Sequence, residues 1–468
     1  MAPIMFLSPV TMAFSNVSKK LLMSHAGFIC NSSLIQKCHQ STSGSQHYDI
    51  IIAGGGLVGT AMACALGSAK VLSEKKILLL EGAPAKPITL KDTYSNRVSA
   101  INHASVELFK HLSIWEDIRG HRVQEVRKMQ VWETCSDSLI TFSEDDLSNP
   151  VAYIIENDLM MWALSKCNEN IPNSSVRYSA KIKDYAFPHS SDVNTPEVLL
   201  ETGEKLSCDL LIGADGINSK VRSKMDTMVE RTDYNQMGVV ATLSLSDPTN
   251  NIVAWQRFLP DGVIALLPLS ESTSSLVWST SVEKAKSLIG LTGDSFVDAV
   301  NEAFLKEFPS NPFVESLLKN LNLSPGTDKQ IPPSINGVQE NSRAAFPLGS
   351  INVSRYVNDC VALIGDAAHR VHPLAGQGVN IGFGDVQCLA DQVAKAAYQG
   401  SHIGKGAHLK VYQSERLYET LPKMKVIHFM HTLYKTSFTP AVVLRSLGLS
   451  LVQSMPLVKK QLIKRANS

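Results

Sequence analysis

Four short apolar runs along the chain have the pattern of strands that are buried on both faces. Residues 48–53, 76–80, 206–213 and 361–364 carry almost continuous aliphatic side chains, which is typical of a parallel sheet covered on both sides. Residues 60–68, between the first two runs, are rich in Ala and Leu and predict a helix. The order strand, helix, strand predicts an α/β, Rossmann-like domain.

A second group of segments alternates apolar and polar residues with a period of two, which predicts strands with one buried face. Together these strands predict an inserted mixed or antiparallel sheet. The segments are Met129–Glu133, Val239–Leu243, Asn251–Phe258, Val263–Leu269 and Leu276–Ser281. Trp132, Trp255 and Trp278 lie on such runs and are expected in the core rather than at a substrate platform. Stretches rich in Ser, Pro and Asn at 187–196 and 324–342 predict exposed loops.

Composition and charge exclude several classes of protein. Lys plus Arg number 44 against 43 Asp plus Glu, so a globally basic nucleic-acid-binding protein is not expected. The eight cysteines include no C-x-x-C pair, which argues against a zinc site or a disulfide framework. The sequence has no stretch of 18 uncharged apolar residues, so no membrane-spanning helix is predicted.

The two ends of the chain differ from the rest in charge. Residues 1–47 contain no Asp or Glu and are rich in Ser, which predicts a mitochondrial transit peptide, although Arg is also absent. A tail without function is the alternative. Residues 420–468 also lack acids, and they carry eight Lys and Arg with recurring apolar residues from Val442 to Val452. This pattern predicts either an amphipathic helix on a membrane surface or a C-terminal helix packed on its own domain.

The first apolar run leads directly into a glycine-rich motif. Residues 54–59 read GGGLVG and match G-x-G-x-x-G, the fingerprint of a dinucleotide site when a strand precedes it and a helix follows. Gly54 permits the tight turn, and Gly56 lets the backbone approach a pyrophosphate at the helix N-terminus. Gly59 lets the helix pack closely on the strand.

The second apolar run ends in an acid at the spacing that this fold requires. Glu81 follows Gly59 by 22 residues. Its carboxylate can accept hydrogen bonds from both hydroxyls of an adenosine ribose and would repel a 2′-phosphate. The site is therefore predicted to take FAD or NAD rather than NADP.

Two further apolar runs end in short motifs. Residues 213–216 read GADG, and residues 365–380 read GDAAHRVHPLAGQGVN, with a helix expected from about Ile381. Together with GGGLVG they resemble the class A flavoprotein monooxygenases, which have the para-hydroxybenzoate hydroxylase fold. The third motif is most similar to the ubiquinone-biosynthesis hydroxylases. Segments 94–99 and 255–260 resemble the mitochondrial members, which hydroxylate ring carbon 5 of 3-polyprenyl-4-hydroxybenzoate.

The resemblance implies FAD as the cofactor and a set of residues that hold it. Asp366 is expected on the ribityl hydroxyls, Asp215 near the pyrophosphate, and Arg97 on the phosphates, with a surface ion pair as the alternative for Arg97. The loop 376–380 would bring backbone N–H groups to the isoalloxazine, and the helix dipole would stabilise the reduced flavin. The full predicted set is Gly54, Gly56, Leu57, Val58, Gly59, Glu81, Arg97, Asp215, Asp366, Gly376, Gly378, Val379 and Asn380.

Two other groups of residues have competing interpretations. Residues 156–158 could line the flavin edge, or Asn157 or Asp158 could cap a helix. His369 and His372 form an H-x-x-H pair, but no acid or thiol that could complete a metal site is close in the sequence. We expect both histidines to hold the loop by hydrogen bonds, and no metal site.

The motifs and the alternating strands predict how the chain is divided. The ranges are 1–47 for the transit peptide, 48–125, 196–225 and 340–400 for the FAD-binding domain, 126–195 and 226–339 for the substrate domain, and 401–468 for a C-terminal helical segment. The second sheet is expected to roof the flavin and to hold an aromatic substrate against it.

The resemblance also implies an activity and its partners. The activity is hydroxylation of the ring of a polyprenylated 4-hydroxybenzoate in ubiquinone biosynthesis, with O2 and by way of a flavin hydroperoxide. The implied electron donors are ferredoxin and its reductase, and other ubiquinone-biosynthesis proteins would join in a complex on the matrix side of the inner membrane. The alternatives are a monooxygenase for another phenol, a flavin reductase or halogenase, and a non-catalytic flavin-bearing subunit.

Overall fold

The computed structural model describes residues 46–134, 138–143, 150–188, 191–248, 250–307, 330–372 and 378–435, together with Gly376 and a few single residues after 315. Residues 1–45 of the predicted transit peptide lie outside the described residues. Almost all of the apolar repeat from Val442 to Val452 does as well.

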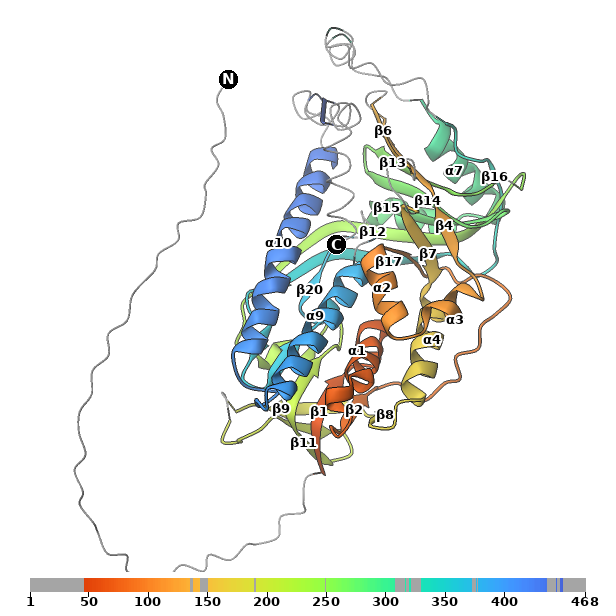
Figure 1. Ribbon diagram of the computed structural model, residues 1–468. Helices are drawn as coiled ribbons and strands as arrows, with labels where there is room; N and C mark the ends of the chain where they lie inside the picture. The colour runs from red at the N-terminus through yellow and green to blue at the C-terminus, as the bar shows by residue number, and fades with distance from the viewer. Residues whose placement is uncertain are drawn as a thin grey trace, which may run out of the picture. The chain divides into compact units, whose positions relative to one another are not determined.

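The first sheet contains the four predicted apolar runs (Figure 1). In the described part of the chain it has eight strands, which are β1 Gln46–Ala53, β2 Ile77–Leu80, β8 Ser174–Arg177, β9 Ile182–Ala186, β10 Glu197–Leu200, β11 Lys205–Gly213, β18 Val357–Asn358 and β19 Val361–Leu363. The strands β8, β2, β1, β11 and β19 follow one another in this order and pair in parallel. The apolar run of β1 is completely buried from Ile50 to Ala53, as expected for a strand covered on both faces.

The second sheet contains the predicted alternating strands. Its nine described strands are β5 Lys128–Glu133, β6 Leu139–Ser143, β12 Val229–Leu245, β13 Val253–Leu259, β14 Gly262–Ser270, β15 Thr273–Ser281, β16 Ile335–Val338, β17 Ala344–Val353 and β20 His369–Arg370. All neighbours pair antiparallel except β13 and β5, so the sheet is mixed, as predicted. Trp132, Trp255 and Trp278 are buried in the core of this sheet, which confirms their prediction.

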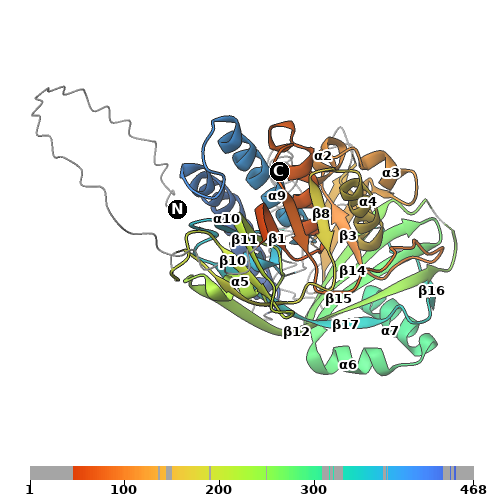
Figure 2. The ribbon, with the colours of Figure 1, turned by 90° about the horizontal axis from the view of Figure 1, so that it is seen from below.

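A small third sheet and nine helices complete the described structure. The third sheet joins β3 Val98–Ile101, β7 Ala152–Glu156 and β4 Gln124–Val126. The helices within the described ranges are α1 Leu57–Ser68, α2 His103–His111, α3 Trp115–Arg119, α4 Asn157–Glu169, α5 Lys220–Lys224, α6 Val282–Gly290, α7 Gly293–Leu305, α9 Gly378–Tyr398 and α10 Ala407–Lys435. Helix α10 runs beside α9 in both views (Figures 1 and 2). None of the helices described is both long and apolar enough to cross a bilayer.

Several predicted boundaries are wrong, and the cause is tertiary pairing. Strand β12 begins at Val229, ten residues before the prediction, because its exposed polar half has β17 as a partner. The predicted loop 324–342 contains β16, which pairs with β12. Strand β8 pairs with β2 although we expected 126–195 in the substrate domain, and β17 joins the second sheet although we expected 340–400 in the FAD-binding domain. The remaining domain limits stay a proposal.

Candidate functional site

Four predicted segments follow four neighbouring strands of the first sheet. The order β2, β1, β11, β19 puts Glu81 after β2, the glycine turn 54–59 after β1, Asp215 after β11 and Asp366 after β19. Because these strands are parallel, their carboxyl ends lie at one edge, outside which open α/β sheets bind ligands. The structure therefore brings together residues that are far apart in the sequence.

Backbone contacts close the glycine turn. Gly54 has a φ of +112°, and a Cβ on it would lie 2.4 Å from the carbonyl oxygen of Ala214. A Cβ on Gly59 would lie 1.9 Å from the carbonyl oxygen of Gly54. The tight turn at Gly54 and the close packing at Gly59, both predicted from the sequence, are confirmed.

Gly56 differs from these glycines because it faces open space. A Cβ at this position would meet no described protein atom within 4 Å. Gly56 is the N-cap of α1, and no described side chain caps this helix end. The first N–H groups of the helix, at Leu57 and Val58, therefore remain available to an anion, together with the positive end of the helix dipole. The helix begins at Leu57 rather than at the predicted Thr60, so these groups belong to its first turn.

The carboxylate of Glu81 is fixed by two backbone donors. The N–H of Gly55 donates to Oε2 at 2.9 Å, and the N–H of Ala83 donates to Oε1 at 2.7 Å. A Cβ on Gly55 would lie 2.7 Å from Oε2 and 2.9 Å from Cβ of Glu81, so any larger residue at this position would displace the acid. A carboxylate has about four acceptor positions. Glu81 therefore keeps capacity for ribose hydroxyls, as predicted, while the role of Gly55 was missed.

Asp215 and Arg222 connect the second motif to the third. Oδ2 of Asp215 accepts from the backbone N–H groups of Lys220 and Val221 at 2.7 and 3.2 Å, and buried Oδ1 has no partner among the described residues. Nη1 of the buried Arg222 donates to the carbonyl oxygen of Ala367 at 2.9 Å. Arg222 therefore holds the loop of Asp366, a role that the sequence did not indicate.

The Asp366 loop leaves its carboxylate accessible. Gly365 has a φ of +58°, and Asp366 keeps 46% of its side-chain surface exposed. The protein packed around the carboxylate raises the pKa of Asp366 above its ordinary value, and Arg370, at 3.9 Å, opposes this rise. The position and exposure fit an acceptor for ligand hydroxyls.

The start of α9 is held by its asparagine. Helix α9 begins at Gly378, before the predicted Ile381, and Val379 lies in its first turn. Oδ1 of Asn380 accepts from the N–H of Asn102 at 3.1 Å, and Nδ2 donates to the carbonyl oxygen of Ala100 at 2.8 Å. Gly376 has a φ of +60°, whereas residues 373–375 and 377 lie outside the described residues. The Asn380 side chain thus joins α9 to β3 and α2, a packing role that the sequence did not predict.

Three further predictions have different outcomes. Arg97 is exposed, and its guanidinium forms no ion pair with an acid that the structure describes, so both interpretations of this residue stay predictions. Helix α4 begins at Asn157, and its N-cap is Glu156 without a described side-chain cap, so capping by Asn157 or Asp158 is wrong. His369 and His372 lie within hydrogen-bond distance of Asp385 and Gln236, which confirms that they hold the loop by hydrogen bonds.

The residues at this edge fit FAD. An uncapped helix start faces the space beside Gly56, where a pyrophosphate would approach. Glu81 lies after the strand on one side of it, and Asp366 lies two strands away on the other side. Asp215 follows β11, the strand between β1 and β19, and its Oδ1 has no partner among the residues that the structure describes. An elongated dinucleotide with hydroxyls at both ends matches this order of acceptor, anion site and acceptor.

Comparisons with known proteins agree with this site. A family model described as an FAD binding domain matches residues 47–317 and 323–420. The protein named ubiquinone biosynthesis monooxygenase COQ6, mitochondrial, of Drosophila melanogaster is 49% identical over 434 residues, 91% of each chain. The Homo sapiens protein of the same name is 44% identical over 436 residues, which cover 90% of this chain and 92% of that protein.

Solved structures share the fold. PqsL of Pseudomonas aeruginosa, a probable FAD-dependent monooxygenase, matches with a TM-score of 0.65 and 20% identity over 86% of this chain and 99% of its own. The p-nitrophenol 4-monooxygenase PnpA of Pseudomonas putida matches with a TM-score of 0.67 and 16% identity over 90% and 99%. The predicted fold class is confirmed, and the names of the relatives support a mitochondrial location. The chain belongs to the family of FAD-dependent monooxygenases that includes the mitochondrial ubiquinone biosynthesis monooxygenases, and its cofactor is FAD.

Proposed function

We propose that this protein hydroxylates the aromatic ring of a polyprenylated 4-hydroxybenzoate, at ring carbon 5, in mitochondrial ubiquinone biosynthesis. The observation that carries the proposal is the order of Glu81, the open helix start, Asp215 and Asp366 along one sheet edge. The names of relatives at 44–49% identity support the pathway.

The chain's own residues position the reactants. FAD, when bound, supplies the activation of O2 and the transfer of one oxygen atom to the ring. Glu81 and Asp366 would hold its two sugar parts, and the first turn of α1 would hold its phosphates. The start of α9 would direct its positive dipole end toward the flavin. We assign no protein residue as a general base.

An apolar cluster between the second and third sheets suits a substrate wall. Its buried members include Ile154, Ala254 and Leu269, and Ala100 packs against it. A Cβ on Gly376 would lie 3.5 Å from Cβ of Ala100, so the cluster adjoins the loop that precedes α9. Such a wall would exclude water and bind the apolar faces of a prenylated phenol.

The activity is tested with the purified FAD-loaded protein. A prenylated 4-hydroxybenzoate, a reductant and isotopically labelled O2 are supplied, and the product is analysed by mass spectrometry. We expect one labelled oxygen atom on ring carbon 5. Labelled oxygen in other phenols but not in this one would favour another substrate. Flavin reduction and reoxidation without any hydroxylated product would favour a non-catalytic flavin-bearing subunit.

We further propose a peripheral position on the matrix side of the inner membrane. Tyr418, Val426 and Phe429 on α10 are 83%, 60% and 55% exposed, and no acid follows Glu419 in the sequence. Exposed apolar and basic groups together favour an anionic lipid surface. Anionic liposomes should capture the protein in a salt-dependent way, and deletion of 440–468 or Phe429→Ser should weaken capture, whereas Val71→Ser should not. Capture that is equal in all variants would contradict this surface.

The proposed electron donors are ferredoxin and its reductase, within an assembly of ubiquinone-biosynthesis proteins. The sequence has one G-x-G-x-x-G fingerprint, at 54–59, and the proposed FAD site uses it. Loss of the flavin colour under anaerobic conditions measures reduction directly. Ferredoxin with its reductase should bleach the flavin fast and NADPH alone slowly. Equally fast bleaching by NADPH alone would contradict the proposed donors.

A further inference from the structure

A buried carboxylate on α9 holds both ends of the loop that carries Asp366. Oδ2 of Asp385 accepts from the N–H of Gly365 at 2.8 Å and lies 2.6 Å from Nε2 of His369. A carboxylate can only accept, so this Nε2 donates. The segment 365–369 is thus fixed at its first and last residues by a single oxygen atom of a side chain that is completely buried.

The other oxygen of this carboxylate is held from α10. Nε of Arg416 donates to Oδ1 of Asp385 at 2.8 Å, and Nη2 donates to the carbonyl oxygen of Ile381 at 3.1 Å. Arg416 also pairs with Glu419, and its side chain is 6% exposed. Burial by itself would raise the pKa of Asp385, but His369 and Arg416 outweigh it and keep the pKa below its ordinary value. Asp385 is therefore ionised at neutral pH.

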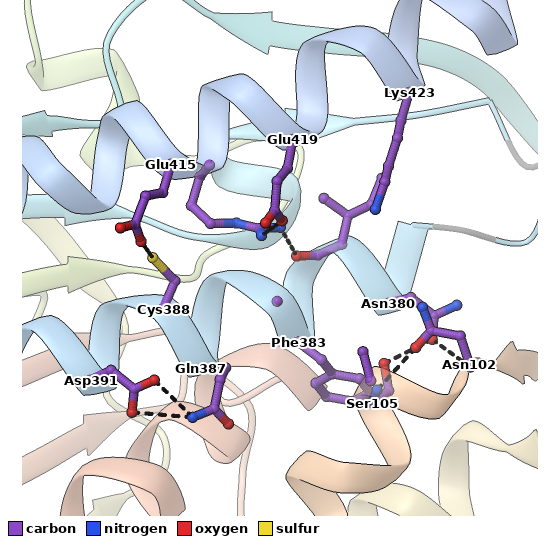
Figure 3. A pocket seen from close by; sticks show the side chains of 14 residues that line it. Asn102, Ser105, Asn380, Phe383, Gln387, Cys388, Asp391, Glu415, Glu419 and Lys423 are labelled. Carbon is purple, nitrogen blue, oxygen red and sulfur yellow. Dashed lines mark hydrogen bonds and ion pairs between the residues drawn. The ribbon is translucent and has the colours of Figure 1, made fainter. Parts of the chain in front are cut away.

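A glycine inside α9 makes room for the arginine. A Cβ on Gly384 would lie 2.7 Å from Nη2 of Arg416. Glycine is disfavoured in a helix interior, so its presence here fits a need for space. A crevice of about 280 Å³ lies beside α9 and α10, and Arg416 is among the residues that line it. Figure 3 shows two other lining residues, Phe383 on α9 and Glu419 on α10.

We propose that Asp385 on α9 and Arg416 on α10 are positioning residues for FAD. Together they hold the Asp366 loop in the conformation that binds the cofactor. A buried ion pair by itself often contributes little to stability. This pair differs because Oδ2 of Asp385 contacts both ends of the loop, whereas Oδ1 is held by Arg416, which lies 31 residues after Asp385 in the chain. The inference rests on the proposed contact of Asp366 with FAD.

The test compares three variants of the full-length protein after removal of FAD. Arg416→Gln removes the charge and the bond to Asp385. Gly384→Ala keeps every charge but displaces the guanidinium. The control is Arg257→Gln, because Arg257 is an equally buried arginine that donates to the carbonyl oxygens of Ala303 and Phe304, away from the four segments of the sheet edge. Flavin fluorescence gives the Kd for FAD, the visible spectrum of bound flavin reports its surroundings, and circular dichroism with Tm reports folding.

We expect Arg416→Gln and Gly384→Ala to raise the Kd for FAD roughly tenfold or more and to change the flavin spectrum. Arg257→Gln should lower Tm without either effect. If Arg416→Gln does not fold, Arg416→Lys takes its place and should show a smaller rise in the same direction. An unchanged Kd and spectrum in a folded Arg416 variant, or an equal rise in Arg257→Gln, would overturn the proposal. Asp366→Ala tests the contact between the Asp366 carboxylate and FAD separately. If this variant binds FAD with the Kd of the wild type, that contact is contradicted, whereas the role of Asp385 and Arg416 in holding the loop is judged from the Arg416 variants.

Discussion

The glycine turn after β1 and the Asp366 loop after β19 serve the same site but are built differently. The glycines that shape the turn all lie within residues 54–59, although the atoms that exclude side chains at Gly54 and Gly55 belong to Ala214 and Glu81. The loop is held by Arg222 from α5, Asp385 from α9 and, through Asp385, Arg416 from α10. A site that uses backbone N–H groups can be encoded locally, whereas a site that uses a side chain needs support from distant parts of the chain.

The largest expected effect on FAD binding comes from a substitution in the glycine turn after β1. Gly56→Val should abolish FAD binding because its side chain would occupy the pyrophosphate approach, while the open space at this position lets the apoprotein fold. Flavin fluorescence titration and circular dichroism measure the two properties. Gly59→Ala is the contrasting control, since its Cβ would lie 1.9 Å from the carbonyl oxygen of Gly54 and should destabilise the fold itself. A Gly56→Val protein that retains FAD would contradict the assigned role of the turn.

Asp366→Ala should have the next largest effect. It removes a charged acceptor from the ligand hydroxyls, and we expect the Kd for FAD to rise by the equivalent of about 1.5–3 kcal/mol. Asp366→Asn, which keeps one acceptor oxygen, should show a smaller rise. Titration of FAD into both apoproteins checks this order. Equal affinity of both variants and the wild type would mean that the loop, and not its carboxylate, contacts the cofactor.

Arg222→Gln should affect FAD less and stability more. The change leaves buried carbonyl oxygens without their donor, so the free energy of unfolding should fall by about 1–3 kcal/mol. The Kd for FAD should rise less than in Asp366→Ala, because the acceptor itself remains. Urea unfolding of the apoprotein and the same FAD titration measure both. A Kd above that of Asp366→Ala would make Arg222 a direct contact.

The smallest effect concerns His372, which follows the loop and packs beside Tyr234 on β12 and His431 on α10. Burial, and then the nearby His431, lower the pKa of His372 from 6.5 to about 3. Below pH 6.5 the unfolded chain therefore binds more protons than the folded chain. The free energy of unfolding decreases as the pH is lowered, by about 1 kcal/mol from pH 7 to pH 5.5. His372→Gln should make the pH dependence of unfolding shallower by this amount. An unchanged dependence would mean that His372 does not stay neutral in the folded protein.

The sequence by itself determined the parallel strands, the glycine turn and the acids that follow the strands. A continuous apolar run such as residues 50–53 predicts a strand covered on both faces even when the covering segments are unknown, and the positive φ of Gly54 favours glycine there. These are local consequences of solvation and sterics. The buried tryptophans of the second sheet were predictable for the same reason.

Only the tertiary structure decided which distant groups support these elements. The polar first half of β12 becomes a strand because β17 supplies its hydrogen bonds, and no local pattern announces that partner. Arg222 and Arg416 look like ordinary helix charges in the sequence, yet both are buried and hold the Asp366 segment, one directly and the other through Asp385. Their role depends on which helices pack beside the sheet edge, and that packing is set by the fold as a whole.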